Sequence, residues 1–357
     1  NAALAGLGIL EDLRASNTRS CAHWTFKDDG SVLGYFGLAF LPEERKKPKR
    51  DRLTNLRVPR NRVREILLKR LLPGTVRFGC RVVDYEEVSN DTGSSVVVVI
   101  EKRVPSSDDE TSHDKKKVGG GAGRPEWAEN EVQKTGGEGS SEGSSFVATE
   151  TLRGVSMLVA SDGVRSAVQR RRMPGASLNY LGVVLITGFT QLRHPLLEKQ
   201  GFYTLDGKRA RVFTMPFSSD EDVMKHEVND DETVIRKSMW QISVRVTEAE
   251  ARALASAPRA LASDFEKSAD AFSSVRAFVR SVAGTWHDPL PAMFNTTDWE
   301  SVWCGPLYDR DEPPRPKTKT NAISRVTAVG DAAHPTLPFL AQGANLALLD
   351  QILLLHK

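Results

Sequence analysis

The sequence has few cysteines and no long hydrophobic run. Its three cysteines, Cys21, Cys80 and Cys304, lie far apart, and none belongs to a CxxC motif. An odd and widely spaced set is a poor framework for disulfides and lacks the spacing of a metal or redox centre. No apolar stretch approaches the roughly 20 residues that a membrane-spanning helix requires. We therefore expect reduced thiols, no transmembrane segment, and a location in the cytoplasm or an organelle.

No excess of one charge is present either. The 49 Lys and Arg residues are balanced by 46 Asp and Glu residues, which leaves a formal net charge of +3. The basic residues do not gather on one recognisable element, so nothing indicates binding to nucleic acid. No grouping of His, Cys and Asp has metal-ligand spacing, and the HExxH and GxSxG motifs are absent. We predict no metal site and no serine-hydrolase site.

The chain begins without a methionine and without the basic leader of a signal peptide. We interpret it as lacking its natural N-terminus. Leu4, Leu7, Leu10 and Leu13 recur at helical spacing, which predicts an amphipathic helix over residues 2–14.

Two segments differ in composition from the rest of the chain. Residues 42–52 are crowded with Lys and Arg and are expected to form a solvated loop. Residues 103–145 are dominated by Gly, Ser, Asp, Glu and Lys, so they cannot bury enough apolar surface to offset the entropy of ordering. We interpret 103–145 as a disordered insertion between two strands.

The remaining pattern predicts an α/β fold with an inserted, mostly antiparallel β-sheet. We expect one domain over residues 1–176 and 301–357, interrupted by a sheet domain over 177–300. Helix signals occur near residues 60–71, and two strands are predicted over 76–88 and 94–102. The expected strands of the inserted sheet are 181–189, 202–205, 211–215 and 238–246, followed by helices over 248–257 and 274–282.

The last strand–turn–helix unit carries the clearest chemical signal. An apolar strand, Val326 to Val329, leads into Gly330 and Asp331, and a helix begins near Gly343. An acid just beyond a buried strand can accept hydrogen bonds from sugar-like hydroxyls. The helix N-terminus presents free N–H groups and a positive dipole end to a ligand in the turn. Such a turn suits a flat, electron-rich cofactor that carries a polyol chain.

At this point the sequence becomes recognisable. The stretch GDAAHPTLPFLAQGAN strongly resembles the second flavin-binding motif of the group A FAD-dependent monooxygenases, which include para-hydroxybenzoate hydroxylase, salicylate hydroxylase and zeaxanthin epoxidase. The resemblance implies that Asp331 binds a ribityl hydroxyl of FAD and that the backbone from Gly343 to Asn345 faces the pyrimidine edge of the flavin. A helix N-terminus there favours the reduced flavin by roughly 0.3–2 kcal/mol. The cofactor-binding residues expected from this motif are Gly330, Asp331, Pro338, Gly343, Ala344 and Asn345.

A second stretch, VASDGVRSAVQRR, resembles the Asp-Gly motif of the same family. That motif lies near the FAD pyrophosphate and is implicated in pyridine-nucleotide binding, roles that would fall to Asp162 and Gly163. Ser166 matches the serine of the motif, but Ala160 and Ser161 replace its usual Gly-Ala pair. The alternative is that Asp162 only caps the helix that follows.

A third stretch, VPRNRVREIL, resembles the segment in which an arginine opens a helix and reaches the FAD phosphates. The resemblance assigns that role to Arg60, and a planar, permanently charged guanidinium suits phosphate. The alternative is a solvated residue at the start of a helix.

The family's first nucleotide-binding turn, GxGxxG after a strand, is absent. Gly6 to Gly8 lie within the predicted first helix, and Gly119 to Gly123 lie within the low-complexity segment. We therefore expect an incomplete FAD-binding domain without its first βαβ unit, truncated also at its C-terminus.

The resemblance implies that NADPH or NADH reduces FAD and that one atom of dioxygen enters an aromatic or alkene substrate. Because the cofactor performs the difficult chemistry, no acid–base residue is assigned, and His334 is taken as structural. Two alternatives remain open. The chain could be another flavoprotein of this fold, a reductase or halogenase, although no halogenase lysine motif is seen. It could also be a catalytically inactive fragment or pseudo-enzyme.

Overall fold

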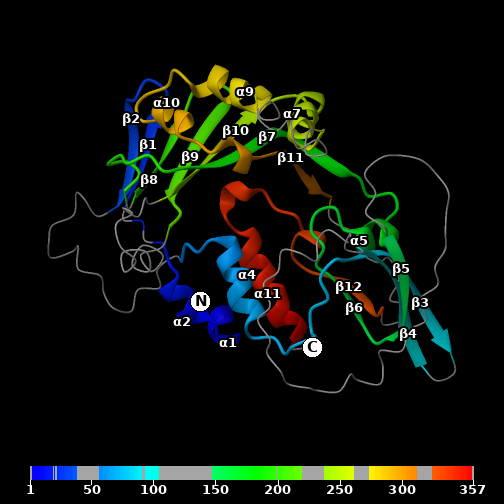
Figure 1. Ribbon diagram of the computed structural model, residues 1–357. Coiled ribbons are helices and arrows are strands. Elements are labelled where there is room, and N and C mark those ends of the chain that lie inside the picture. The colour runs from blue at the N-terminus through cyan, green and yellow to red at the C-terminus, as the bar shows by residue number, and fades with distance from the viewer. Residues whose placement is uncertain are drawn as a thin grey trace, which may run out of the picture. The chain divides into compact units, whose positions relative to one another are not determined.

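The computed structural model describes most of the chain in two compact units (Figure 1). Unit 1 comprises Asn1–Leu71 and Tyr180–Leu307, and unit 2 comprises Leu72–Asn179 and Tyr308–Lys357. The residues that the structure describes are 2–18, 20, 22–37, 56–90, 93–103, 147–198, 200–218, 237–260, 273–311 and 324–355. The α/β class with a large, mainly antiparallel sheet is confirmed.

Unit 1 is built around a seven-stranded sheet with the strand order β11-β7-β10-β9-β8-β1-β2. Strands β1 and β8 run parallel, while β7, β10, β9 and β8 run antiparallel to one another in that order. The strands are β1 (Ala22–Lys27), β2 (Val32–Gly37), β7 (Leu178–Thr190), β8 (Gln200–Leu205), β9 (Ala210–Pro216), β10 (Ser238–Arg245) and β11 (Trp303–Arg310). The predicted strands and helices of the inserted sheet domain are confirmed within a few residues.

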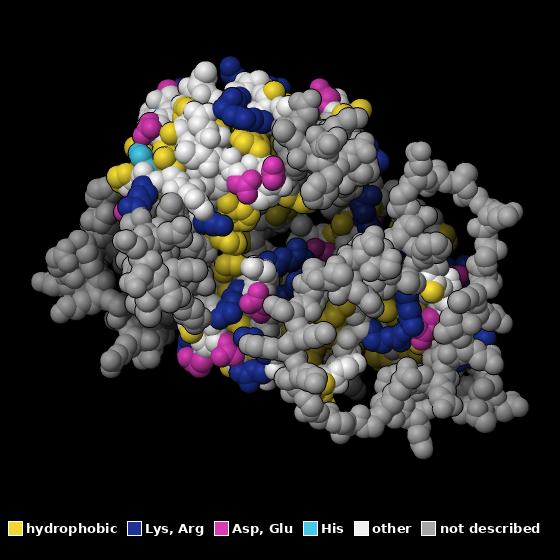
Figure 2. All heavy atoms as spheres, viewed as in Figure 1, with side chains coloured by type: hydrophobic (Ala, Val, Ile, Leu, Met, Phe, Trp, Pro, Cys, Tyr) yellow, Lys and Arg dark blue, Asp and Glu magenta, His cyan; other side chains and the backbone are white. Residues whose placement is uncertain are grey.

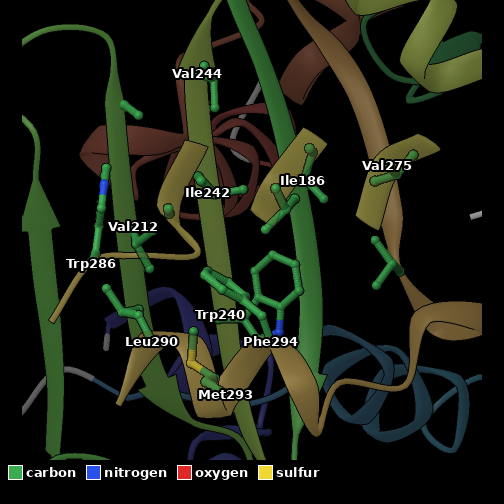
Figure 3. Close-up of a cluster of buried hydrophobic side chains, with 14 of the residues drawn as sticks. Ile186, Val212, Trp240, Ile242, Val244, Val275, Trp286, Leu290, Met293 and Phe294 are labelled. Atoms are coloured by element: carbon green, nitrogen blue, oxygen red, sulfur yellow. The ribbon is translucent and has the colours of Figure 1, made fainter. Parts of the chain in front are cut away.

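Three helices cover one face of this sheet: α7 (Glu248–Ala260), α9 (Ser273–Ala283) and α10 (Leu290–Asn295) (Figure 1). The strands contribute a buried row in which Val212 pairs with Ile242 and Ile242 pairs with Ile186. Figure 3 shows these side chains and Trp240 packed against Leu290, Met293 and Phe294 of α10. Successive side chains of a strand point to opposite faces, so the residues between these core positions lie on the other face. The helical side of this core includes Val275, Leu290, Met293 and Phe294.

Trp240 leaves no space for a side chain at its cross-strand partner, Gly188. A Cβ atom on Gly188 would lie 2.5 Å from Cζ2 of the Trp240 ring. We expect Gly188→Ala to lower the free energy of unfolding by about 1–3 kcal/mol, the usual effect of overpacking a core. Urea denaturation followed by tryptophan fluorescence measures this change. The control is Gly34→Ala in β2, where the nearest atom, Cβ of Thr25, is 4.0 Å away; equal stability of both variants would contradict the packing argument.

The prediction of one continuous helix over residues 2–14 is wrong, because the helix is interrupted near its centre. The segment forms α1 (Ala2–Gly6) and α2 (Leu10–Ala15), separated at Gly8, whose φ of +67° is left-handed. A right-handed helix cannot continue through that backbone conformation. Buried Ile9 and Leu13 pack against Ile66 of α4 (Arg60–Leu68), so the apolar stripe does form a small core.

Unit 2 contains two smaller sheets. The antiparallel strands are β3 (Cys80–Asn90), β4 (Gly93–Arg103) and β5 (Val147–Val155), and the parallel pair is β6 (Leu158–Ala160) with β12 (Val326–Ala328). Helices α5 (Ala167–Arg172) and α11 (Gly343–Leu355) follow β6 and β12. Buried Val96, Val98 and Ile100 of β4 pack with residues of both β6 and β12 in one core.

The grouping differs from the expected division at three places. Residues 301–307 group with the large sheet, and residues 177–179 group with unit 2. Residues 1–71 were expected to belong with the first domain, but they group with the large sheet, because β1 pairs with β8 over its whole length. The basic loop at 42–52 and, apart from Arg103 in β4, the insertion at 103–145 lie outside the described residues. On the face drawn in Figure 2, the Lys and Arg side chains are interspersed with Asp and Glu, in keeping with the small net charge.

Candidate functional site

Two acid-bearing turns follow neighbouring parallel strands in unit 2. Strands β6 and β12 pair in register, with Ala160 opposite Ala328, and the amide of Val329 donates to the carbonyl of Ala160. Asp162 is the second residue after β6, and Asp331 is the third residue after β12. Because the carboxyl ends of parallel strands meet at one edge of a sheet, the pairing brings the two sequence motifs side by side.

The turn after β12 is held by a carboxylate from α11. Gly330 has a φ of +57°, and a Cβ atom there would lie 3.2 Å from Cβ of Ala347, so the position requires glycine. Its amide donates to Oδ2 of Asp350 over 2.7 Å, and Nε2 of His334 lies 2.7 Å from the same oxygen. The structural role expected for His334 is therefore what its contacts show.

Asp331 behaves differently from a capping residue. Its side chain is exposed and makes no hydrogen bond within the part of the chain that the structure describes. Its Oδ1 lies 3.6 Å from the point where a Cβ on Gly343 would stand, and Oγ1 of Thr336 lies 3.2 Å from that point. The Thr336 hydroxyl is buried and has no partner among the described residues. A carboxylate and a hydroxyl therefore flank the backbone at the first residue of α11, where a side chain would crowd the Thr336 hydroxyl.

This arrangement fits the polyol and ring edge of a flavin. Asp331 and Thr336 offer oxygen atoms to hydroxyl groups, and the thirteen-residue helix α11 presents its N-terminal amides and positive dipole end. Pro338 begins a short 3₁₀ turn, η5 (Pro338–Leu340), that leads towards this helix. Exposed Ala344 and Asn345 lie in the first turn of α11. The side-chain amide of Asn345 donates a hydrogen bond to the Ala341 carbonyl. The six residues expected from the final motif thus share one loop and helix start.

The Asp-Gly motif has a local structural role. Oδ2 of Asp162 accepts from the Ala167 amide at 2.8 Å, and Oγ of Ser166 accepts from the Gln169 amide at 3.0 Å. Both side chains therefore satisfy free N–H groups at the start of α5. Gly163 adopts a left-handed φ of +82° between them, with open space around its Cα atom. The capping alternative holds for Asp162, and a role towards a cofactor stays a prediction.

Arg60 belongs to unit 1, whereas all the other candidate residues belong to unit 2. It is the exposed first residue of α4 and lines a cavity of about 620 Å³ within unit 1. Phe189, Phe217 and Lys237 line the same cavity, and the two phenyl rings lie 4.5 Å apart. Its phosphate-binding role stays a prediction.

The sheet face opposite the helices carries a second group of polar and aromatic side chains that the sequence did not reveal. The ring of Phe213 stacks on Tyr203 at 4.6 Å and on His23 at 6.1 Å, measured between ring centroids. The Arg211 guanidinium lies over the Tyr203 ring at 5.4 Å. Only the strand register shows that these residues share one face.

Burial governs the protonation of this group. Burial and the nearby Arg57 charge lower the pKa of His23, and burial lowers the pKa of Arg211. Nη2 of Arg57 lies 3.2 Å from Nε2 of His23, and because a guanidinium only donates, that ring nitrogen accepts. His23 is therefore neutral, with a buried Nδ1 that has no partner within the described ranges.

Other kinds of site find no support in the described parts of the chain. Within them, no group of three or more His, Cys, Asp or Glu side chains is arranged to hold a metal ion. No helix among the described residues has the length and apolar character needed to cross a membrane.

Comparison with known proteins points to one class. The chain is 46% identical over 67 residues to 3-amino-4-hydroxybenzoate 2-monooxygenase of Streptomyces cremeus and 36% identical over 81 residues to 6-hydroxynicotinate 3-monooxygenase of Bordetella bronchiseptica. These segments cover 19% and 23% of this chain, and 15% and 19% of those proteins. The structure superposes with a TM-score of 0.60 on a variant of Klebsiella pneumoniae HpxO complexed with FAD, at 18% identity, covering 97% of this chain and 66% of that one. No family model matches the chain.

The resemblance expected from the flavin motif is therefore confirmed. The chain shares its fold with FAD-complexed HpxO, and its matching segments are similar in sequence to two proteins named as monooxygenases.

The contacts of Asp350 give a test of how the turn is held. We expect Asp350→Ala to lower the free energy of unfolding of unit 2 by about 1.5–3 kcal/mol, because the Gly330 amide loses a charged acceptor. Thermal unfolding measures the change. The control is Asp84→Ala, whose more exposed carboxylate pairs with Arg171 at the surface. If both variants unfolded at the same temperature, Asp350 would not hold the turn.

Proposed function

We propose that the protein is a FAD-dependent monooxygenase that hydroxylates an aromatic substrate at the expense of NADPH or NADH. The observation that carries the proposal is the Asp331 carboxylate, set beside the Thr336 hydroxyl at the N-terminus of α11; neither has a hydrogen-bond partner among the described residues. Two free oxygen ligands beside a helix N-terminus suit a ligand that has both hydroxyl groups and an electron-rich ring.

In the proposed reaction, one oxygen atom of dioxygen replaces a ring hydrogen as a hydroxyl group. The second oxygen atom leaves as water, and NADPH or NADH supplies the two electrons that balance the reaction. Bound FAD supplies the transfer of electrons and the activation of dioxygen. The protein's own residues bind and orient the reactants, which is why no acid–base pair is needed in the candidate site.

The residues of unit 2 have distinct tasks in this proposal. Asp331 and Thr336 would accept hydrogen bonds from the ribityl chain of FAD, and Gly343 would let the backbone approach the ring. The N-terminus of α11 would stabilise negative charge on a bound flavin by roughly 0.3–2 kcal/mol. Asp350 keeps the Gly330 turn in place through the contacts described above.

The side chains on the sheet face opposite the helices support the proposal of an aromatic substrate. Stacked Tyr203 and Phe213 provide flat surfaces for an aromatic ring, and Arg211 provides a positive charge beside them. The two curated relatives are named for aromatic acids. We propose that the substrate is a planar aromatic compound with an anionic group.

The first test is flavin binding by the whole chain. Because the GxGxxG turn is absent from the sequence, we expect added FAD to bind only weakly, with quenching of its fluorescence, and Asp331→Asn to weaken this binding by about a further 10–100-fold. That range corresponds to one lost hydrogen bond to a charged group, about 1.5–3 kcal/mol. The control is Asp84→Asn, which removes an exposed carboxylate of the same unit. A chain that takes up no FAD at millimolar concentration would overturn the proposal and favour the inactive alternative.

The second test concerns the substrate. We expect Arg211→Met to raise the KM for 4-hydroxybenzoate about tenfold or more, and to change the KM for phenol little, because only the former carries a carboxylate. Substrate-dependent oxidation of NADPH measures both values. The control is Arg209→Met, which removes an exposed charge just before β9. Equal effects of Arg211→Met on both compounds would exclude Arg211 as the anion ligand.

A further inference from the structure

We infer that Arg310 is a positioning residue that fixes the spacing of the two acid-bearing turns. Arg310 is the last residue of β11. Its Nη1 donates to the Ala332 carbonyl at 2.9 Å, and its Nη2 donates to the Val164 carbonyl at 2.7 Å. One guanidinium therefore joins the turn that contains Asp331 to the turn that contains Asp162.

The turns need such a connection because their strands are short. Strands β6 and β12 have three residues each, and their pairing continues only to the bond between the Val329 amide and the Ala160 carbonyl. Beyond that bond the two backbones leave the sheet. A guanidinium is planar and holds its donors in a fixed fork, so it sets the distance between two acceptors more strictly than a flexible ammonium does.

The charge of Arg310 is compensated within the same unit. Burial lowers the pKa of Arg310, and the Asp162 carboxylate opposes this effect. The neighbouring Tyr308 ring of β11 lies under the Arg165 guanidinium at 5.4 Å, so the Asp-Gly turn contacts the same strand a second time. The Arg310 guanidinium donates its hydrogen bonds to main-chain carbonyls and not to Asp331. The Asp331 carboxylate can therefore still bind a ligand. Its action on a flavin would therefore be indirect, through the position of the turns, and this part rests on the proposed function.

The strand pair offers a matched comparison at its other end. There, Nη1 of Arg325 donates to the Ser156 carbonyl at 3.0 Å, just before β12 and β6 begin. Both arginines join the same two segments through a bond from guanidinium to carbonyl. Among the residues that the structure describes, only Arg310 does so at the acid-bearing turns, so the two residues separate a role in the site from a role in strand pairing.

The test compares Arg310→Met, Arg310→Lys and Arg325→Met in the whole chain. Three quantities are measured: amide hydrogen exchange of residues 162–167 and 330–336 without FAD, the affinity for FAD, and the melting temperature. We expect Arg310→Met to speed exchange in both turns and to weaken FAD binding about tenfold or more. Arg310→Lys should recover only part of this loss, and Arg325→Met should change FAD affinity less than twofold.

Measuring hydrogen exchange without FAD beside FAD affinity keeps this inference separate from the proposed function. Unchanged exchange in both turns of Arg310→Met would overturn the positioning role, whatever happens to FAD binding. Equal losses of FAD affinity in Arg310→Met and Arg325→Met would also overturn it, and would leave Arg310 as a tether of the strand pair. If the unaltered chain bound no FAD, the proposed function would fail, while faster exchange in Arg310→Met would still support the link between the turns.

Discussion

The candidate site depends on the parallel pairing of β6 with β12. These strands come from parts of the chain separated by the whole inserted sheet, and each has only three residues. So short a pair contributes few hydrogen bonds, and its stability comes from the apolar residues of β4 that pack beneath it. Once the pair forms, the turns that follow both strands must lie at the same edge. The position of every flavin-site candidate in unit 2 follows from this constraint.

The two turns show how one residue type takes different roles. Asp162 and Asp331 both follow a strand and precede a helix. The Asp162 carboxylate accepts a hydrogen bond from a backbone amide of α5, whereas the Asp331 carboxylate accepts no hydrogen bond from the described residues. The task of holding the second turn falls to Asp350, which reaches back from α11 to the Gly330 amide. Because the backbone is held by another carboxylate, Asp331 can remain free for a ligand. This separation makes Asp331 the better candidate for cofactor binding.

In unit 1, the register of the strands decides which side chains lie on which face of the large sheet. Across the strands, Val212, Ile242 and Ile186 form a row in the helix-covered core, and Phe213, Gln241 and Thr187 form the next row on the opposite face. A shift of one residue would exchange these faces and place polar side chains in the core. The same alternation that builds the core therefore presents the aromatic and cationic side chains proposed to bind substrate.

The sequence alone determined the class of fold and most strands and helices, and it revealed the resemblance of the final motif, because these depend on local periodicity and on a run of residues with few structural alternatives. It also located strands β7 to β10 and helices α7 and α9 within a few residues. It did not foresee the break at Gly8, because a left-handed backbone within an apolar stripe leaves the periodicity intact. Nor could it show that Arg310 joins the two turns or that Tyr203 and Phe213 stack, because these contacts bring together residues that only strand pairing and packing place side by side. Local pattern fixed the elements, and long-range pairing fixed the site.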